Sequence, residues 1–113
     1  MEILDKNIEI MSLYDIYQNV LTSKQREYIE SYYFEDLSIT EISEEFGVSR
    51  NAVHDQIKKT VKKLYDLESN MMIKDRTSKR KKLIDKIRLV STQDEVKDIL
   101  DELEKVEWYY GIR

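Results

Sequence analysis

The sequence predicts an all-α protein. It contains no proline and only two glycines, Gly47 and Gly111, so few residues interrupt a helix. Charged residues make up 37% of the 113 residues, and Glu, Lys, Leu and Ile are abundant, which favours helices. Apolar residues also recur at helical spacing along most of the chain. A helical bundle with a small core is therefore expected.

The first predicted helix covers residues 8–21, and residues 1–6 show no pattern. Thr22 followed by Gln25 forms a capping-box pattern, so a second helix is expected to begin there and to run over residues 23–34. The apolar residues expected to face inward are Ile10, Leu13, Tyr14, Tyr17, Val20 and Leu21 in the first helix and Ile29, Tyr32 and Tyr33 in the second.

Residues 38–64 carry the most informative motif, because they predict two helices joined by a tight turn. After a break at residues 35–37, Ser38 and Glu41 form another capping-box pattern, which begins a short helix that ends near Phe46. Gly47 stands where the end of a helix needs left-handed backbone, and Ser49 is placed to cap the next helix.

The helix after this turn divides into an apolar face and a polar face. The residues expected to face inward are Val53, Ile57, Val61 and Leu64, and those expected on the far side are Asn51, Asp55, Lys58, Lys59 and Lys62. This is the layout of a helix-turn-helix, whose second helix usually lies in the major groove of DNA.

The C-terminal part predicts further helices with a less regular pattern. Leu67, Met71 and Met72 are placed to continue the helix that carries Lys62, while residues 74–82 are strongly basic and interrupt the apolar seam. The seam resumes with Leu83, Ile84, Ile87 and Val90. A last helix is expected to begin at the cap formed by Thr92 with Glu95 and to end near Tyr110. Its apolar residues are Val96, Ile99, Leu100, Leu103, Val106 and Trp108. We therefore divide the chain into a helix-turn-helix domain, residues 1–68, and a helical extension, residues 69–113.

The net charge of −4 is distributed unevenly along the chain. Residues 1–49 have 3 Lys/Arg against 11 Asp/Glu, residues 50–88 have 13 against 5, and residues 89–113 have 3 against 7. A basic middle between acidic flanks predicts a local positive surface that suits a nucleic acid. The alternative is that these charges only solvate long helices.

Three groups of polar side chains are candidates for nucleic-acid binding. The residues expected to contact base edges are Arg50, Asn51, His54, Asp55 and Lys58, since Arg pairs with guanine and Asn with adenine. The residues expected at phosphates are Ser49, Lys59, Lys62 and Lys63. A second basic patch is expected at Lys79, Arg80, Lys81 and Lys82, or this run is only the solvated side of a helix. The alternative for the helix-turn-helix of residues 38–64 is that it serves only as a packing or protein-binding unit. The alternative for His54 is that it is a surface residue without a function.

Several function classes find no support in the sequence. It has no cysteine and one histidine, which excludes a disulfide framework and argues against a metal site. It also lacks a phosphate-binding glycine loop and a nucleophile motif, so we expect no enzyme activity and no cofactor. No apolar run reaches the length of a membrane span, and the N-terminus lacks a signal-peptide core, so we expect a cytosolic, soluble protein.

Residues 21–64 resemble region four of bacterial sigma factors. The similarity lies in Leu21-Thr22-Ser23-Lys24-Gln25-Arg26 and in the string from Ile39 through Glu41-Ile42 to Gly47-Val48-Ser49-Arg50. The chain is more similar still to the YlxM-like family of small bacterial proteins, through residues 13–18 and through LTSKQREYIESYYFEDLSITEISEEFGVSRNAV. It differs from that family at His54, where relatives often have Tyr, and in residues 71–82.

The resemblance implies a DNA-binding regulator without catalytic activity. YlxM-like proteins are encoded beside the signal recognition particle protein and its receptor, which implies a role in that pathway. The chain lacks the sigma block that melts promoters, so a working sigma factor is not expected. Two hypotheses follow: a homodimer that reads duplex DNA, or an adaptor that binds the RNA or protein of the signal recognition particle through residues 74–88. A third, a purely protein-binding module, predicts no nucleic-acid affinity.

Overall fold

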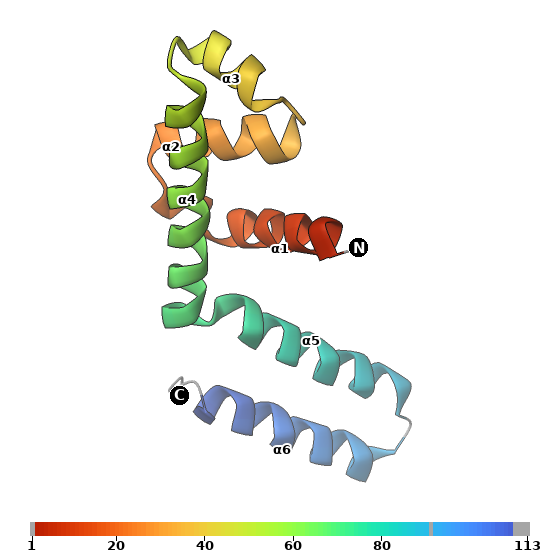
Figure 1. The fold of residues 1–113 in the computed structure, drawn as a ribbon. Coiled ribbons are helices and arrows are strands. Elements are labelled where there is room, and N and C mark those ends of the chain that lie inside the picture. Colours follow the sequence, from red (N-terminus) through yellow and green to blue (C-terminus); the bar gives the residue numbers. More distant parts are fainter. Residues whose placement is uncertain (1, 91, 110–113) are drawn as a thin grey trace. The chain divides into compact units, whose positions relative to one another are not determined.

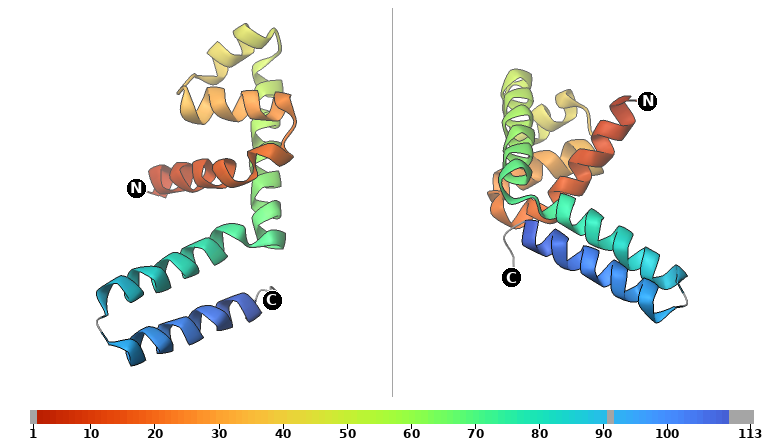
Figure 2. Two further views of the ribbon diagram at one scale, coloured as in Figure 1. Left: turned by 180° about the vertical axis from the view of Figure 1, so that it is seen from behind. Right: turned by 90° about the horizontal axis from the view of Figure 1, so that it is seen from below.

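The computed structural model describes residues 2–90 and 92–109, with the side chains of residues 4–90 and 92–106. The described elements are all helical, which confirms the predicted all-α class, and the chain forms two compact units (Figures 1 and 2). We call residues 1–71 the N-terminal unit and residues 72–113 the C-terminal unit. The elements are, in order, α1 (Glu2–Tyr17), η1 (Gln18–Val20), α2 (Ser23–Ile29), η2 (Glu30–Phe34), α3 (Ile39–Phe46), α4 (Arg50–Met71), α5 (Ile73–Leu89) and α6 (Gln93–Tyr109).

The first helix differs from its prediction at both ends. Helix α1 begins at Glu2, so the predicted start at residue 8 was wrong. Once the buried part of a helix has formed, extending it by residues without helix breakers costs little, even where Leu4 and Ile8 stay exposed. At the other end α1 stops at Tyr17, and a 3₁₀ turn follows, in which Val20 is 48% exposed rather than buried. The turn directs Leu21 inward instead.

Helix α2 begins as predicted and then changes its geometry. Both bonds of the capping box are present: the Thr22 hydroxyl accepts from the Gln25 N–H at 3.1 Å, and the Gln25 side chain accepts from the Thr22 N–H at 2.9 Å. From Glu30 to Phe34 the helix widens into a π-helix. Ile29, which ends α2, is fully buried as predicted. Within the π-helix Tyr32 and Tyr33 are only half-buried.

The predicted signals around α3 are confirmed. Ser38 and Glu41 form both bonds of a capping box at 3.1 Å, and the helix ends at Gly47, which has φ 66° and ψ 34° in the left-handed region. The Val48 N–H donates to the Ser43 carbonyl oxygen at 3.1 Å, which closes the end of the helix in the manner of a Schellman motif.

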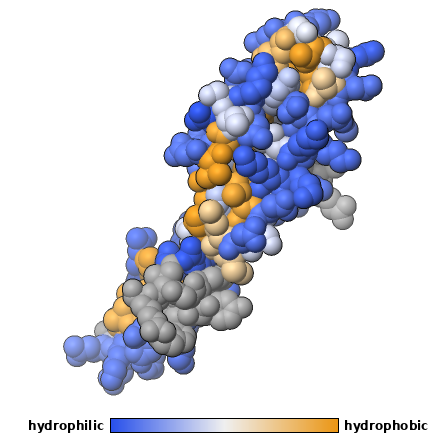
Figure 3. Space-filling model, turned by 90° about the vertical axis from the view of Figure 1, so that its left-hand side faces the viewer, coloured by the Kyte–Doolittle hydropathy of each residue, from blue (hydrophilic) through white to orange (hydrophobic). Residues whose placement is uncertain are grey.

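Helix α4 is the axis of the N-terminal unit. Helices α1, α2 and α3 each pack against it, at successive levels along its length (Figure 1). Its inward face is a stripe of buried residues that includes Val53, Ile57 and Leu64, as predicted, and also Thr60, whose hydroxyl donates to the Gln56 carbonyl oxygen at 2.8 Å. On the face drawn in Figure 3, hydrophilic side chains cover much of the surface, and hydrophobic ones gather in patches between them.

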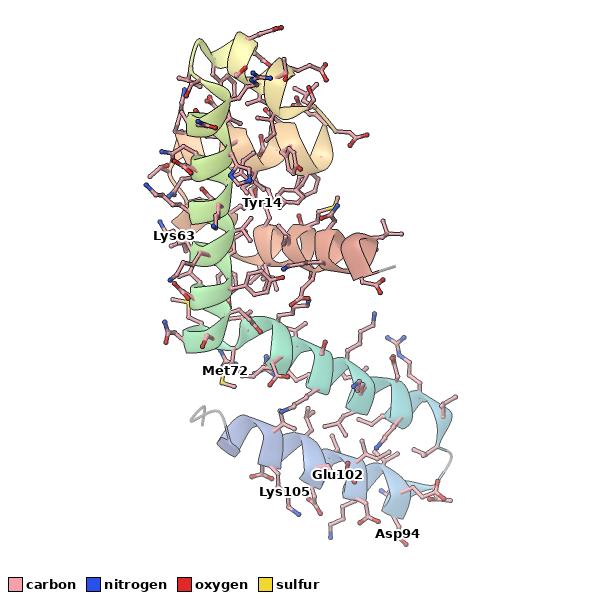
Figure 4. The ribbon with its side chains drawn as sticks, viewed as in Figure 1. Tyr14, Lys63, Met72, Asp94, Glu102 and Lys105 are labelled. Carbon is pink, nitrogen blue, oxygen red and sulfur yellow. The ribbon has the colours of Figure 1, made fainter. Side chains whose placement is uncertain are left out.

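A buried tyrosine ties α1 to η2. Tyr14 lies between these two elements, where its hydroxyl donates to a carboxylate oxygen of Glu30 and its ring contacts that of Phe34 at 5.2 Å between centroids (Figure 4). Burial, and secondly the Glu30 carboxylate, raise the pKa of Tyr14 to about 12. The hydroxyl therefore stays protonated at neutral pH and acts as the donor.

The C-terminal unit is an antiparallel hairpin of α5 and α6 (Figure 1). Leu83 and Ile99 are buried, whereas Ile84 and Leu100, which the sequence predicts to belong to the apolar seam, are 43% and 48% exposed. Residues that follow each other point about 100° apart around a helix, so two neighbours cannot both face one partner helix. Thr92 caps α6 as predicted, and its hydroxyl accepts from the Glu95 N–H at 3.2 Å. The expected helix end at Tyr110 and the side chains of Trp108 and Tyr109 lie outside what the structure describes.

We predict that Gly47→Ala lowers the free energy of unfolding by about 1–2 kcal/mol, because alanine is strained in left-handed backbone. A Cβ added at this position would meet nothing within 4 Å, so the effect is one of backbone conformation and not of a clash. Urea denaturation followed by circular dichroism measures it. Gly47→Asn is the matched control and should cost less, since asparagine tolerates left-handed backbone. Equal losses for the two variants would contradict this explanation.

Candidate nucleic-acid interface

The turn between α3 and α4 is rigidly defined by short-range bonds. Gly47 ends α3, and the Ser49 hydroxyl then accepts from the Ala52 N–H at 3.1 Å, which caps α4. Behind the turn, Ile42 of α3 and Val53 of α4 are fully buried in one cluster. The first turns of α4 are thereby held at a fixed angle to α3, which is the requirement for a recognition helix.

An aromatic contact that is not evident from the sequence also supports α3. The rings of Tyr28 and Phe46 meet edge to face at 5.0 Å between centroids, and the Lys24 ammonium lies 4.8 Å from the centroid of Phe46. This places a cation of α2 beside the end of α3. In the sequence, this contact is indicated only by a lysine, Lys24, four residues before Tyr28. That spacing is too common in helices to be informative.

The predicted base-contacting residues all lie exposed on the first half of α4. Arg50 is the first residue of the helix, and Asn51, His54, Asp55 and Lys58 follow it on the side away from the buried stripe. Spacings of three and four residues place Asn51, Asp55, Lys58 and Lys62 on one continuous strip. His54 lies at the edge of this strip, where it also lines a groove of the N-terminal unit.

The predicted phosphate-contacting residues do not all share this strip. Lys62 is exposed and pairs with Asp66 at 2.9 Å, an ion pair that water screens and that breaks at little cost. Lys59 is exposed on the neighbouring flank. Lys63 is half-buried, and its ammonium donates to the Gln25 side chain at 3.4 Å. Lys63 is therefore turned toward α2, while Ser49 sits at the start of the helix as its cap.

The four cations at residues 79–82 do not form a single patch, because consecutive residues point in different directions around α5. A hollow of about 310 Å³ is lined by four lysines, Lys79, Lys82, Lys86 and Lys105. Lys79 also pairs with Asp75 at 3.2 Å. Arg80 and Lys81 line another hollow of about 420 Å³ on α5. Its other lining residues are Thr77, Ile84, Asp85 and Arg88. Lys86 is paired with Glu102, which projects from α6, at 3.8 Å (Figure 4).

A groove lies beside the recognition helix and brings together residues that are far apart in the sequence. It has a volume of about 350 Å³ and contains side chains of α1, η2, α3 and α4. We call it the α1–α4 groove. Its lining residues are Lys6, Asn7, Ile10, Tyr32, Tyr33, Ile39, His54, Ile57, Lys58 and Val61. Sequence reasoning missed this groove, because only the folded chain places α1 near His54.

The short α3, the left-handed turn and the exposed polar face of α4 together define a helix-turn-helix protein. Within the part of the chain that the structure describes, no helix has both the length and the apolar character needed to cross a bilayer. Known sequences give the same class. The chain belongs to the UPF0122 family, described as "Putative helix-turn-helix protein, YlxM / p13 like", which matches residues 4–106. The resemblance to YlxM-like proteins is thereby confirmed.

Relatives match the chain over nearly all of their length. A UPF0122 protein of Oceanobacillus iheyensis is 42% identical over 104 residues, which cover 92% of this chain and 99% of the relative. A UPF0122 protein of Bacillus licheniformis is 40% identical over 105 residues, covering 92% and 98%, and one of Bacillus thuringiensis is 38% identical over 109 residues, covering 92% and 99%.

Proposed function

We propose that this protein is a DNA-binding regulator that acts in the cytoplasm and inserts the first half of α4 into the major groove of duplex DNA. The base-contacting residues in this proposal are Arg50, Asn51, His54, Asp55 and Lys58. The residues assigned to phosphates are Ser49, Lys59, Lys62 and Lys63. The role is one of binding and not of catalysis.

One observation carries the proposal: directly after a capped helix-turn-helix, the outward strip of α4 combines amide, carboxylate and ammonium groups, and the guanidinium of Arg50 lies at the first residue of the helix. Arginine and asparagine form two bonds with guanine and adenine respectively, and aspartate accepts from the amino group of cytosine. Lys58 and Lys62 follow on the same strip and add favourable charge near the DNA backbone. Lys63 contributes only if its long side chain leaves Gln25.

We predict that Arg50→Ala relaxes the sequence preference, with a loss of about 1–3 kcal/mol on the preferred sequence and little loss on unrelated DNA. Lys62→Ala should weaken binding to every sequence and reduce the slope of log K against log salt by about 0.9. The preferred sequence is first selected from a random duplex library, and fluorescence anisotropy at several salt concentrations then measures affinity. Lys97→Ala, a lysine of α6, is the matched control and should change neither quantity.

Equal losses on all DNA for Arg50→Ala and Lys62→Ala would contradict base reading by Arg50.

The second candidate function, an adaptor of the signal recognition particle, is favoured by the density of cations on α5, which has eight Lys/Arg against two Asp/Glu. In that case charge reversal at Lys79, Arg80, Lys81 and Lys82 abolishes RNA or protein binding, while Asn51→Ala leaves it intact. An A-form RNA helix hides its major groove, so α4 would not read it.

We also propose that the protein binds DNA as a homodimer formed by the C-terminal unit. Helices α5 and α6 are antiparallel (Figure 1). Ile84 and Leu100 each follow a buried residue by one position, so helical geometry places both on the same face of this antiparallel hairpin. Helix α5 is basic, whereas α6 has two Lys against seven Asp/Glu. A two-fold axis parallel to the helices packs α5 of one copy on α6 of the other, which pairs opposite charges in an antiparallel four-helix bundle.

We predict that Ile84→Glu converts the dimer to a monomer, because it buries a carboxylate in the proposed interface opposite the acidic α6 of the second copy. Leu89→Glu is the matched control: Leu89 is 86% exposed and lies about 140° around α5 from Ile84, so the dimer should persist. Sedimentation equilibrium over a range of concentrations gives the oligomeric state. A wild-type protein that stays monomeric at every concentration would overturn the dimer.

A further inference from the structure

The α1–α4 groove has features of a ligand site that DNA binding alone does not explain. An adjoining hollow of about 360 Å³ shares Asn7, Tyr32 and Tyr33 with it and extends toward Ser38. A volume of about 350 Å³ falls at the lower end of the range of small-molecule sites, near the size of a mononucleotide.

The wall formed by η2 presents aromatic surface. In the π-helix the Glu35 N–H donates to the Glu30 carbonyl oxygen at 2.8 Å, and the rings of Tyr32 and Tyr33 meet edge to face at 5.0 Å between centroids. Single π-helical turns occur frequently at functional sites, because they change the direction of a few side chains. The other apolar residues that line the groove are aliphatic: Ile10, Ile39, Ile57 and Val61. A flat ring system can pack against such a combination of aromatic and aliphatic surface.

The charges of the groove are of one sign. Lys6 of α1 and Lys58 of α4 line it together with His54, and no acidic side chain is among its lining residues. Among the described residues none of these three side chains takes part in an ion pair. The acids nearby, Asp36 and Glu41, line the adjoining hollow instead, where Glu41 already accepts from the Ser38 N–H at 3.1 Å. The groove therefore complements an anion.

We propose that the α1–α4 groove binds a small aromatic anion, a molecule with a flat ring system and a phosphate or carboxylate group. The ligand ring stacks on one of the two perpendicular rings of Tyr32 and Tyr33 and meets the other at its edge. The anionic group lies between Lys6 and Lys58, with His54 as an additional donor. Asn7 supplies a polar contact at the junction of the two hollows.

Occupation of the groove regulates the nucleic-acid interface, and this part of the inference rests on the proposed DNA binding. His54 and Lys58 are shared: they line the groove and also belong to the base-contacting face of α4. A bound anion neutralises Lys58 and holds both side chains away from the DNA. The ligand thereby weakens DNA binding by competing for the same two residues.

The ligand site is tested without DNA, by titrating the full-length protein with adenosine monophosphate in isothermal calorimetry and by ¹H–¹⁵N chemical shifts. We expect chemical-shift changes at residues of α1, η2 and α4. Adenosine, which lacks the phosphate, and ribose 5-phosphate, which lacks the aromatic ring, should both bind more weakly than adenosine monophosphate. Lys6→Gln should weaken the nucleotide about fivefold. Lys97→Gln is the matched control and should leave it unchanged.

Asn7→Asp provides a second variant, because it adds a negative charge beside the anion and should weaken binding at least as much as Lys6→Gln. Circular dichroism verifies that both variants fold. Absence of binding at millimolar nucleotide, or binding that neither variant weakens, would overturn the site.

The regulatory part is tested with the selected duplex. Saturating adenosine monophosphate should lower DNA affinity, and Lys6→Gln should require about five times more nucleotide for the same effect. Nucleotide binding without a change in DNA affinity overturns the competition only. A wild-type protein that binds no DNA overturns the proposed function, and the nucleotide titration then still decides the ligand site.

Discussion

The N-terminal unit depends on the burial of one stripe of α4. Val53, Thr60 and Leu64 are fully buried, and α1, α2 and α3 all pack against the helix that carries them. Burying an aliphatic side chain of this size contributes about 1.5–3 kcal/mol, so this stripe is a main source of the stability of the unit. Because the same helix period places Asn51, Asp55 and Lys62 on the opposite side, the burial that folds the protein also fixes the direction of its polar face.

Polar bonds complement this burial by fixing the positions of the helices relative to one another. The Tyr17 hydroxyl donates to a carboxylate oxygen of Glu68 at 2.6 Å, which links α1 to the second half of α4, while Tyr14 links α1 to Glu30 of η2. Apolar contacts are not directional, whereas each hydrogen bond requires one alignment. The position of α1, and with it the placement of Lys6 near Lys58, follows from both kinds of contact.

Local signals in the sequence predicted most of the helix boundaries. The Thr22 and Ser38 capping boxes, the left-handed Gly47 and the Thr92 cap depend on neighbouring residues only, and each is present. Features that depend on packing were not predictable: the exposure of Val20, the π-helix at Glu30–Phe34, and the left-handed backbone of Met72, which separates α4 from α5. In the candidate nucleic-acid interface, too, local features were predictable and features that depend on packing were not. Exposure of the predicted base-contacting residues of α4 followed from helical periodicity, but the turn of Lys63 toward Gln25 and the groove required the folded chain.

The π-helix has a consequence for the length of the chain. A π-helical turn is equivalent to one residue inserted into an α-helix, so deleting Glu30 or Ser31 would allow the segment to return to α geometry. Tyr32 and Tyr33, which follow the deletion, would both rotate by about 100° and would leave their place in the wall of the α1–α4 groove. The number of residues between the two capping boxes is thus a structural constraint in its own right. Length variation in this segment among relatives would mark proteins whose aromatic wall has been remodelled.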